Sequence, residues 1–318
     1  MINAQLLEKL KVITDEEQKI IDGEIDIDRS LYMDDENNVI NSKKILSAGK
    51  QIAVRPHTRF VHFPQHSHDF DEIIYMCSGS TTHIVDGDKI TLKEGELLFL
   101  CQSAKQEILP AGMDDIAVNF VIRPEFFDNA LQMIGEEDTP LRRFLVECLK
   151  NDRASAGYLH FQVADVIPVQ NLLENLIWTL INETHSKRNM NQITMGLLFL
   201  QLMGHADKLA ARSKEEQTVV KVLNYIETNY KNGSLTQLSE LLHYDISALS
   251  REIKSKTGKK YIDLVHEKRL SQSCFLLKNT DMNVEEIADV VGYKNISFFH
   301  RLFKKYYGVS PKKYRAIR

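Results

Sequence analysis

The chain has 318 residues, enough for two domains, and its 43% hydrophobic and 26% charged residues and net charge of -4 are typical of a globular protein. No apolar run approaches the roughly 20 residues that a membrane span needs, the N-terminus has no apolar signal core, and none of the four cysteines forms a CxxC pair. These features argue against a membrane protein, a secreted disulfide framework and a zinc ribbon, and they predict a cytoplasmic protein that binds no membrane.

The first 45 residues are expected to form a helical arm, in which residues 1–22 form one helix with Leu6 and Leu10 on its apolar face. From residue 46 to 123 the pattern changes to short apolar runs separated by turn sequences. This alternation is typical of a β-sandwich or β-barrel. The expected strands are Gln51–Val54, Phe60–Phe63, Glu72–Met76, Thr82–Val85, Ile90–Leu92, Leu97–Cys101 and Ile116–Ile122.

Two histidines and an acidic residue stand out in this strand-rich region. His66 and His68 are two apart, so on an extended chain they point to the same face, and Glu72 follows nearby. Three interpretations stay open: part of a metal site, a metal-free pocket for a small-molecule effector, or hydrogen-bonded residues at a barrel mouth with no ligand. Three basic side chains lie just upstream: Arg55, His57 and Arg59. They favour an anionic or sugar-like effector, unless they are only solvated.

Turns at Gly79, Gly87 and Gly95 complete a pattern that is similar to the cupin barrels. Cupin metal sites usually take another histidine from a later strand. The resemblance implies that this position falls near residues 105–107, where the chain has Gln106. An amide is a poor zinc or iron ligand beside two imidazoles. We therefore expect no metal ion or other cofactor, and the alternative of a cupin enzyme, such as a dioxygenase or isomerase, is disfavoured.

Residues 124–212 are expected to form a helical extension of the barrel. The predicted helices cover about 124–134, 141–150, 164–183 and 192–211. Residues 171–182 carry a broad apolar stripe that either packs in the core or forms a dimer interface. The stripe contains Leu173, Leu176 and Leu180. Residues 195–203 are apolar nearly all round and are expected to be buried, and the polar residues 212–217 are expected to form a short linker.

Residues 213–318 are basic and contain an internal repeat. Their 19 Lys and Arg against 12 Asp and Glu give a net charge of +7, which is typical of a domain that meets the phosphates of nucleic acid. The segment Leu235–Tyr244 aligns with Val284–Tyr293. After one added residue, Ser247, Arg251, Lys254 and Gly258 match Ser297, Arg301, Lys304 and Gly308. Each copy has the pattern of a helix-turn-helix unit: a short helix, a tight turn, a second helix and a closing glycine.

The second helix of each copy is predicted to have one buried and one exposed face. The apolar side chains are four apart and form a buried stripe: Leu249 and Ile253, and likewise Phe299 and Phe303. The outward-facing residues are Ser247, Ser250, Arg251 and Lys254 in the first copy, and Ile296, Ser297, His300, Arg301 and Lys304 in the second. Because Arg binds guanine edges, Ser donates or accepts, and Lys meets phosphate, these residues are the predicted DNA contacts.

The connections of the repeat set its geometry. Gly292 suits a sharp corner in the second copy, whereas His243 stands at this position in the first, which predicts a turn that differs in detail. Between the copies, residues 261–278 are expected to form an amphipathic helix of roughly 27 Å. With its flanking turns, this helix would hold two recognition helices about one DNA turn apart, roughly 34 Å.

The block from about Val219 to Arg315 resembles the DNA-binding domain of the AraC/XylS regulators. The resemblance is carried by Leu249–Lys254 with Thr257-Gly258, Lys268–Leu270, Ile287-Ala288 with Val291–Tyr293, Phe298–Lys304, and Gly308–Pro311 with Tyr314-Arg315. It implies a homodimeric transcription regulator, by family habit an activator, that binds double-stranded promoter DNA and a small-molecule effector and contacts RNA polymerase.

The expected fold class is therefore α+β. We expect an N-terminal helical arm over 1–45, a cupin-like barrel over 46–123, a helical extension with a dimerisation role over 124–212, and an all-α domain with two helix-turn-helix units over 213–318. Two other interpretations remain. One is a constitutive DNA-binding protein whose barrel only dimerises, and the other is a plain helical bundle with solvated basic faces.

Overall fold

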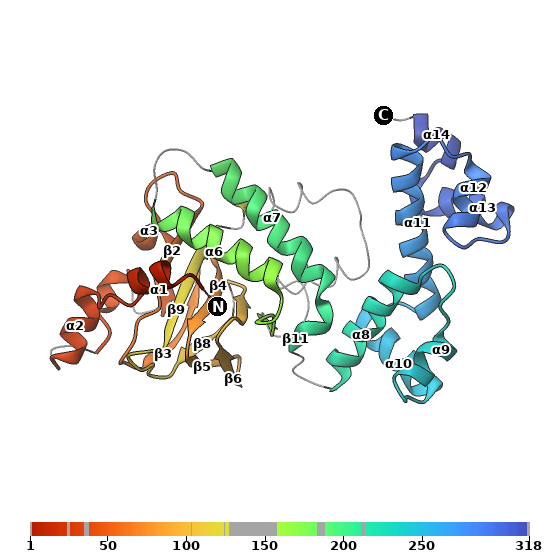
Figure 1. Ribbon diagram of the computed structural model, residues 1–318. Coiled ribbons are helices and arrows are strands. Elements are labelled where there is room, and N and C mark those ends of the chain that lie inside the picture. Colours follow the sequence, from red (N-terminus) through yellow and green to blue (C-terminus); the bar gives the residue numbers. More distant parts are fainter. Residues whose placement is uncertain are drawn as a thin grey trace. The chain divides into compact units, whose positions relative to one another are not determined.

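The computed structural model describes residues 2–23, 26–34, 38–102, 104–123, 125–126, 158–182, 188–210 and 214–316. These residues form two compact units, the first ending at Ala210 and the second starting at Lys214 (Figure 1). Strands dominate the first unit and helices make up the second, which confirms the predicted α+β class. Within the described ranges, no helix is both long and apolar enough to cross a membrane.

The first unit is built from two sheets. Their strands are β1 (Val39–Ile40), β2 (Ile52–Pro56), β3 (Phe63–His68), β4 (Asp71–Ser78), β5 (Ser80–Val85), β6 (Asp88–Lys93), β7 (Leu97–Leu100), β8 (Gln106–Ile108), β9 (Ile116–Ile122), β10 (Tyr158–Phe161) and β11 (Leu209–Ala210). One sheet has the order β1-β3-β8-β5-β6 and the other β11-β10-β7-β4-β9-β2. One apolar cluster takes residues from both sheets, including Ile74 and Leu98 of one and Val85 and Leu92 of the other. The sheets therefore share a core, as the predicted barrel requires.

Turn chemistry explains where several strands end. Asp86 and Gly87 both have positive φ, at 50° and 90°, which is the geometry of a two-residue hairpin turn between β5 and β6. The strand predicted at Phe60–Phe63 is wrong, because Phe60 has a φ of 69° and strand β3 begins only at Phe63. Strands β1, β8, β10 and β11 were not predicted.

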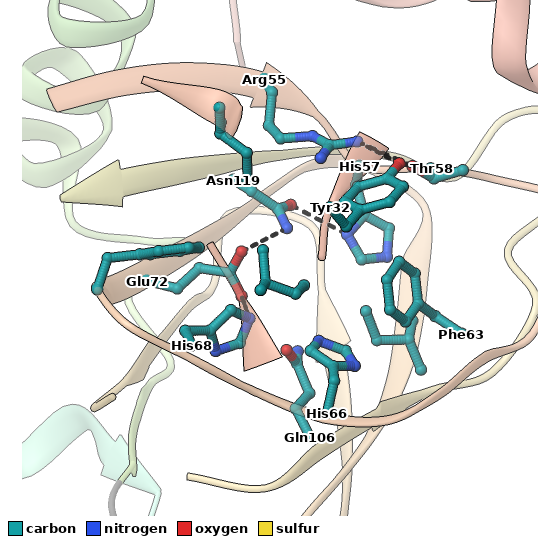
Figure 2. Close-up of a pocket in the computed structure, with 14 residues that line it drawn as sticks. Tyr32, Arg55, His57, Thr58, Phe63, His66, His68, Glu72, Gln106 and Asn119 are labelled. Carbon is teal, nitrogen blue, oxygen red and sulfur yellow. Dashed lines mark hydrogen bonds and ion pairs between the residues drawn. The ribbon is translucent and has the colours of Figure 1, made fainter. Parts of the chain in front are cut away.

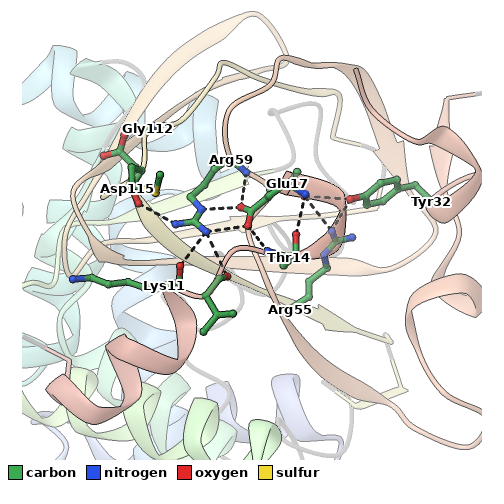
Figure 3. A network of polar contacts seen from close by, with 11 residues as sticks. Lys11, Thr14, Glu17, Tyr32, Arg55, Arg59, Gly112 and Asp115 are labelled. Atoms are coloured by element: carbon green, nitrogen blue, oxygen red, sulfur yellow. Dashed lines mark hydrogen bonds and ion pairs between the residues drawn. The ribbon is translucent and has the colours of Figure 1, made fainter. Parts of the chain in front are cut away.

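The N-terminal arm is two short helices, α1 (Ala4–Leu10) and α2 (Asp15–Ile21), and not the single helix predicted over 1–22. Thr14 starts the second helix, because its side chain and that of Glu17 cap each other's backbone N–H groups. Glu17 also forms a buried ion pair with Arg59 of the barrel, with Nε and Oε1 2.7 Å apart (Figure 3). The arm continues through η1 (Arg29–Leu31) and α3 (Ser42–Ile45).

Helices α6 (Ile167–Ile181) and α7 (Arg188–Gly204) belong to the same unit. The Tyr75 hydroxyl on β4 donates to Gln170 Oε1 of α6 at 2.6 Å, and the rings of Phe99 on β7 and Phe199 on α7 are 5.7 Å apart. The six-stranded sheet therefore buries one face against these two helices. The helices predicted at 124–134 and 141–150 lie outside the described residues, except for Glu125 and Phe126.

The structure decides between the two interpretations of the α6 stripe, and it overturns one expectation about α7. Leu173 and Leu176 are completely buried, and Leu180 is half-buried, so the stripe on α6 packs mainly into the core instead of forming a dimer surface. Leu197 and Leu200 of α7 are 47% and 43% exposed, although residues 195–203 were predicted to be buried. The sequence is apolar on most sides of α7, but the sheet covers only one of its faces.

The second unit confirms the repeat. It contains α8 (Lys214–Asn229), α9 (Leu235–Leu241), α10 (Ile246–Thr257), α11 (Tyr261–Asn279), α12 (Val284–Val290), α13 (Ile296–Tyr307) and α14 (Pro311–Ala316). Helices α9 and α12 both begin with a capping box, while α10 and α13 both end at a glycine in the left-handed conformation, Gly258 and Gly308. Because α8 begins at Lys214, the linker predicted over 212–217 is wrong in its extent.

Candidate functional site

The first unit contains a cavity with an empty volume of about 420 Å³, counting the part that is open to solvent (Figure 2). Its walls come from the arm and from strands of both sheets. The lining residues are Tyr32, Ile40, Ile45, Arg55, His57, Thr58, Phe63, His66, His68, Phe70, Glu72, Gln106, Ile108 and Asn119.

The structure brings the three predicted effector residues together in this cavity. His66, His68 and Glu72 are all buried, and His68 Nε2 lies 3.6 Å from Glu72 Oε2. His66 pairs with Gln106 across strands β3 and β8, so Gln106 occupies the position inferred for a later histidine. The spacing of two along β3 therefore had the predicted effect, because both imidazoles face the same interior.

A polar chain that the sequence analysis missed joins His57 to Glu72. His57 Nδ1 donates to Asn119 Oδ1 at 3.0 Å, and Asn119 Nδ2 donates to Glu72 Oε1 at 2.9 Å. Asn119 is the one polar residue in the otherwise apolar strand Ile116–Ile122. This exception could have identified it as a candidate site residue from the sequence alone. Arg55 closes one end of the cavity, where its guanidinium donates to the Tyr32 hydroxyl at 2.7 Å.

Burial controls the charge of these groups. It lowers the pKa values of His57 and His66 to about 4 and that of His68 well below its ordinary value, because desolvation penalises the imidazolium form. The same desolvation raises the pKa of Glu72 to about 7. At neutral pH the cavity therefore presents neutral imidazoles beside a carboxyl group that burial makes harder to ionise.

Several of these buried polar atoms have no hydrogen-bond partner within the described part of the protein. They are His57 Nε2, both ring nitrogens of His68 and Glu72 Oε2. A buried polar atom without a partner is costly, so such atoms are rare unless a ligand or water completes them. Because the Nδ1 proton of His57 is donated to Asn119, His57 Nε2 offers an acceptor lone pair to whatever enters the cavity.

The same residues do not fit a metal ion. Among the described residues, no three His, Cys, Asp or Glu side chains are grouped so that they could hold one. His66 Nδ1 donates to the Pro64 carbonyl at 2.8 Å, and an amide stands at position 106.

The second unit presents the predicted recognition faces. Leu249, Ile253, Phe299 and Phe303 are completely buried, which confirms both apolar stripes. Of the predicted DNA contacts, Ser247, Arg251, Lys254, Ser297, Arg301 and Lys304 are exposed, and Ser250, Ile296 and His300 are half-buried. Helix α11, with 19 residues and a length of roughly 29 Å, connects the two helix-turn-helix motifs.

The turns of the two copies are alike, contrary to the expectation from His243. His243 adopts a φ of 52°, on the same left-handed side as Gly292 at 95°. The N–H groups that follow also bond in the same way, from Tyr244 to the Ser239 carbonyl and from Tyr293 to the Ala288 carbonyl. The first copy therefore keeps the sharp corner without glycine, at some cost in backbone strain.

A barrel whose cavity is lined by buried polar groups, joined to paired helix-turn-helix units, defines the class of effector-controlled, DNA-binding transcription regulators. Comparison with known families agrees: residues 51–202 match the AraC-like ligand binding domain, and residues 238–317 match a helix-turn-helix domain. The chain belongs to the AraC family of transcription regulators. This confirms the family resemblance seen in the sequence.

Individual relatives are distant. The HTH-type transcriptional activator RhaS of Mannheimia succiniciproducens is 26% identical over 80% of this chain and 89% of its own length. The xylose operon regulatory protein of Escherichia coli K12 is 27% identical, but over only 33% of this chain and 27% of its own length. Among solved structures, the C-terminal domain of AraT, a response regulator from Geobacillus stearothermophilus, is 33% identical over 33% of this chain and 89% of that domain, with a TM-score of 0.32.

Proposed function

We propose that the cavity in Figure 2 is the effector site and that its ligand is a small, uncharged, polyhydroxylated molecule of the sugar type. The observation that carries this proposal is the set of buried polar atoms without partners on His57, His68 and Glu72. Hydroxyl groups both donate and accept, so they suit a wall that alternates acceptors with donors. The rings of Phe63 and Phe70 add apolar faces to the same cavity.

An anionic effector fits less well. The lone pair of His57 Nε2 and the carboxyl group of Glu72 both repel negative charge, and Arg55 is already engaged with Tyr32 and Thr58. The relative named for a xylose operon matches only the C-terminal third of the chain, so its name carries no information about this cavity.

Calorimetric titration of the full chain with a panel of monosaccharides and small carboxylic acids tests this proposal. We expect a sugar to bind, and His57→Phe to weaken that binding about tenfold or more, because the variant keeps a ring but loses the acceptor. His62→Phe is the matched control, since His62 is exposed and does not line the cavity. Binding of acids alone, or an equal affinity of both variants, contradicts the proposal.

We further propose that both helix-turn-helix units contact promoter DNA through the nine residues predicted above. The exposed basic side chains of α10 and α13 and the +7 charge of residues 213–318 support this assignment. The relative named as a transcriptional activator matches 80% of this chain, and its name favours activation. Contact with RNA polymerase is carried over from the family resemblance. A cytoplasmic location and a sensing rather than enzymatic barrel complete the proposal. In vitro transcription with and without the bound sugar measures the sign of the effect.

A homodimer is also proposed, with its interface moved from α6 to α7. Met190, Ile193, Leu197 and Leu200 are each between 43% and 50% exposed, and their spacing of three, four and three residues follows the seam of a coiled coil. A second copy of the same helix matches such a seam, so Leu197→Glu should yield folded monomers by light scattering. Val12→Glu, at an exposed apolar residue of the arm, should leave the dimer mass unchanged.

A further inference from the structure

We propose that Arg269 is a positioning residue that sets the distance and rotation between the recognition helices α10 and α13, and thereby the operator spacing that the protein accepts. The inference rests on the proposed use of both units for DNA binding. It concerns a side chain in the middle of α11 that was not among the predicted DNA contacts.

Arg269 binds the backbone just after α8, the helix that precedes the first helix-turn-helix motif. Its Nε donates to the carbonyl oxygen of Tyr230 and its Nη2 to that of Lys231, both at 2.8 Å. These carbonyls belong to the turn that directly follows the last residue of α8, Asn229. The planar guanidinium therefore holds two consecutive peptide units in one orientation, whereas the donors of a Lys ammonium group rotate on a flexible stem and fix no such orientation.

The second helix-turn-helix motif, α12 and α13, contacts the same stretch of backbone. A Cβ atom at Gly292, in the turn between α12 and α13, would lie 2.6 Å from the Lys231 carbonyl oxygen and 3.2 Å from Arg269 Cζ. The guanidinium of Arg269 also lies 5.3 Å from the ring centre of Tyr293 in that turn. We name this contact between the two helix-turn-helix motifs the inter-unit junction. It consists of Arg269, Gly292 and the backbone of Tyr230 and Lys231.

The neighbouring residue strengthens the attachment of α8 to α11. Lys268 Nζ lies 2.6 Å from Glu227 Oε2, and both side chains are largely buried. The junction differs from this ion pair because it alone includes the turn that leads into α13. Loss of the two hydrogen bonds from Arg269 should therefore leave each helix-turn-helix motif folded, while one motif becomes free to rotate against the other.

A fixed junction has a measurable consequence on DNA. One inserted base pair rotates two sub-sites by about 34° and separates them by roughly 3.4 Å. A rigid protein cannot follow this change without losing base contacts, whereas a protein with a loosened junction can. Spacing tolerance is thus a readout that a merely stabilising side chain would not change.

The test uses the full-length protein and an operator obtained by binding-site selection with the wild type. Duplexes carry zero, one or two base pairs inserted between the two sub-sites. We expect the wild type to lose roughly tenfold or more in affinity per insertion, as when a good base contact is broken. We expect Arg269→Lys to lose most of this penalty while keeping wild-type helicity. Gly292→Ala, which pushes the turn away from Lys231, should behave like Arg269→Lys, and Lys254→Ala should bind more weakly with the penalty intact.

The outcomes are separable. A wild-type footprint over a single groove segment overturns the two-unit proposal, and this inference with it. Two protected segments with no spacing penalty in the wild type overturn the inference alone. The same holds if Arg269→Lys is folded, as judged by circular dichroism and cooperative unfolding, and retains the full penalty. That result would mean that the positive charge at position 269 sets the spacing penalty and that the paired hydrogen bonds of the guanidinium do not.

Discussion

Two arginines occupy equivalent positions in the repeat, and they carry the sharpest prediction at the residue scale. Arg251 and Arg301 are exposed on α10 and α13, each four residues after a serine on the same helix face. If each reads a base edge, replacement by alanine should cost about 1–3 kcal/mol of binding free energy and relax sequence preference at one operator position. The two relaxed positions should lie roughly 10 base pairs apart. Binding-site selection with each variant measures both effects.

The adjacent lysines are the controls for this experiment. Lys254→Ala and Lys304→Ala should weaken binding to all sequences about equally, as expected for phosphate contacts. If Arg301→Ala also loses affinity uniformly and keeps its sequence preference, Arg301 is a backbone contact. The second helix-turn-helix motif then binds only the DNA backbone and reads no base.

Glu72 makes the stability of the barrel depend on pH. Its folded-state pKa of about 7 lies above its ordinary value of 4.5, because burial penalises the carboxylate. The folded state therefore holds this proton more tightly, and the stabilisation is complete below pH 4.5 and lost as the pH rises through 7.

The variant Glu72→Gln isolates this effect. Relative to it, the wild type should lose on the order of 1–3 kcal/mol of unfolding free energy between pH 4.5 and pH 7.5. The buried histidines titrate in the opposite sense, but they are common to both proteins and cancel in the difference. Urea unfolding at several pH values measures it, and a difference that stays constant would refute the raised pKa.

At the scale of elements, one buried ion pair fastens the arm to the barrel. Arg59 and Glu17 are 2.7 Å apart and almost fully buried, and Arg59 also donates to the carbonyl of Met113 (Figure 3). Glu17→Gln leaves the Arg59 charge buried and only partly compensated, which should lower the unfolding free energy by about 3 kcal/mol or more.

A second ion pair in the same arm is a matched control. Glu8 and Lys11 are 3.6 Å apart and solvent-exposed. Glu8→Gln should therefore cost less than about 1 kcal/mol. Thermal unfolding of the two variants compares them directly, and equal losses would show that the arm is not held through Arg59.

At the scale of the whole molecule, charge is divided between the units. Residues 213–318 carry +7 and residues 1–212 carry -11. The isolated segment 213–318 should therefore bind DNA by itself, with an affinity that falls steeply with salt because each phosphate contact releases about 0.9 counterion. Fluorescence anisotropy at several salt concentrations measures the slope. A folded segment that ignores its genomic sites at low salt would contradict this division of labour.

Local patterns predicted much of this molecule. The repeat in residues 235–308, the buried stripes of α10 and α13 and the facing pair His66 and His68 all follow from helix and strand periodicity, which depends only on neighbours along the chain. For the same reason the family resemblance was visible in the second unit, whose helices are short and whose capping residues are local.

Other features depended on contacts between distant segments. Only the folded chain brings these residues into one polar chain, because His57 lies just after β2, Asn119 on β9 and Glu72 on β4. Strand β8 has three residues and no pattern of its own, and it exists because it pairs with β3 and β5.

The division between sequence and structure is clearest on α6 and α7. Amphipathic spacing determined that both helices have apolar faces, since spacing is a property of the helix itself. Which face meets the sheet was decided only by the tertiary structure, which buries Leu173 and Leu176 and leaves Leu197 exposed. Likewise, Arg269 was part of the Lys268–Leu270 motif that carries the family resemblance. Its hydrogen bonds to the carbonyls of Tyr230 and Lys231, however, span 38 or more residues. A contact over that distance leaves no periodic trace in the sequence.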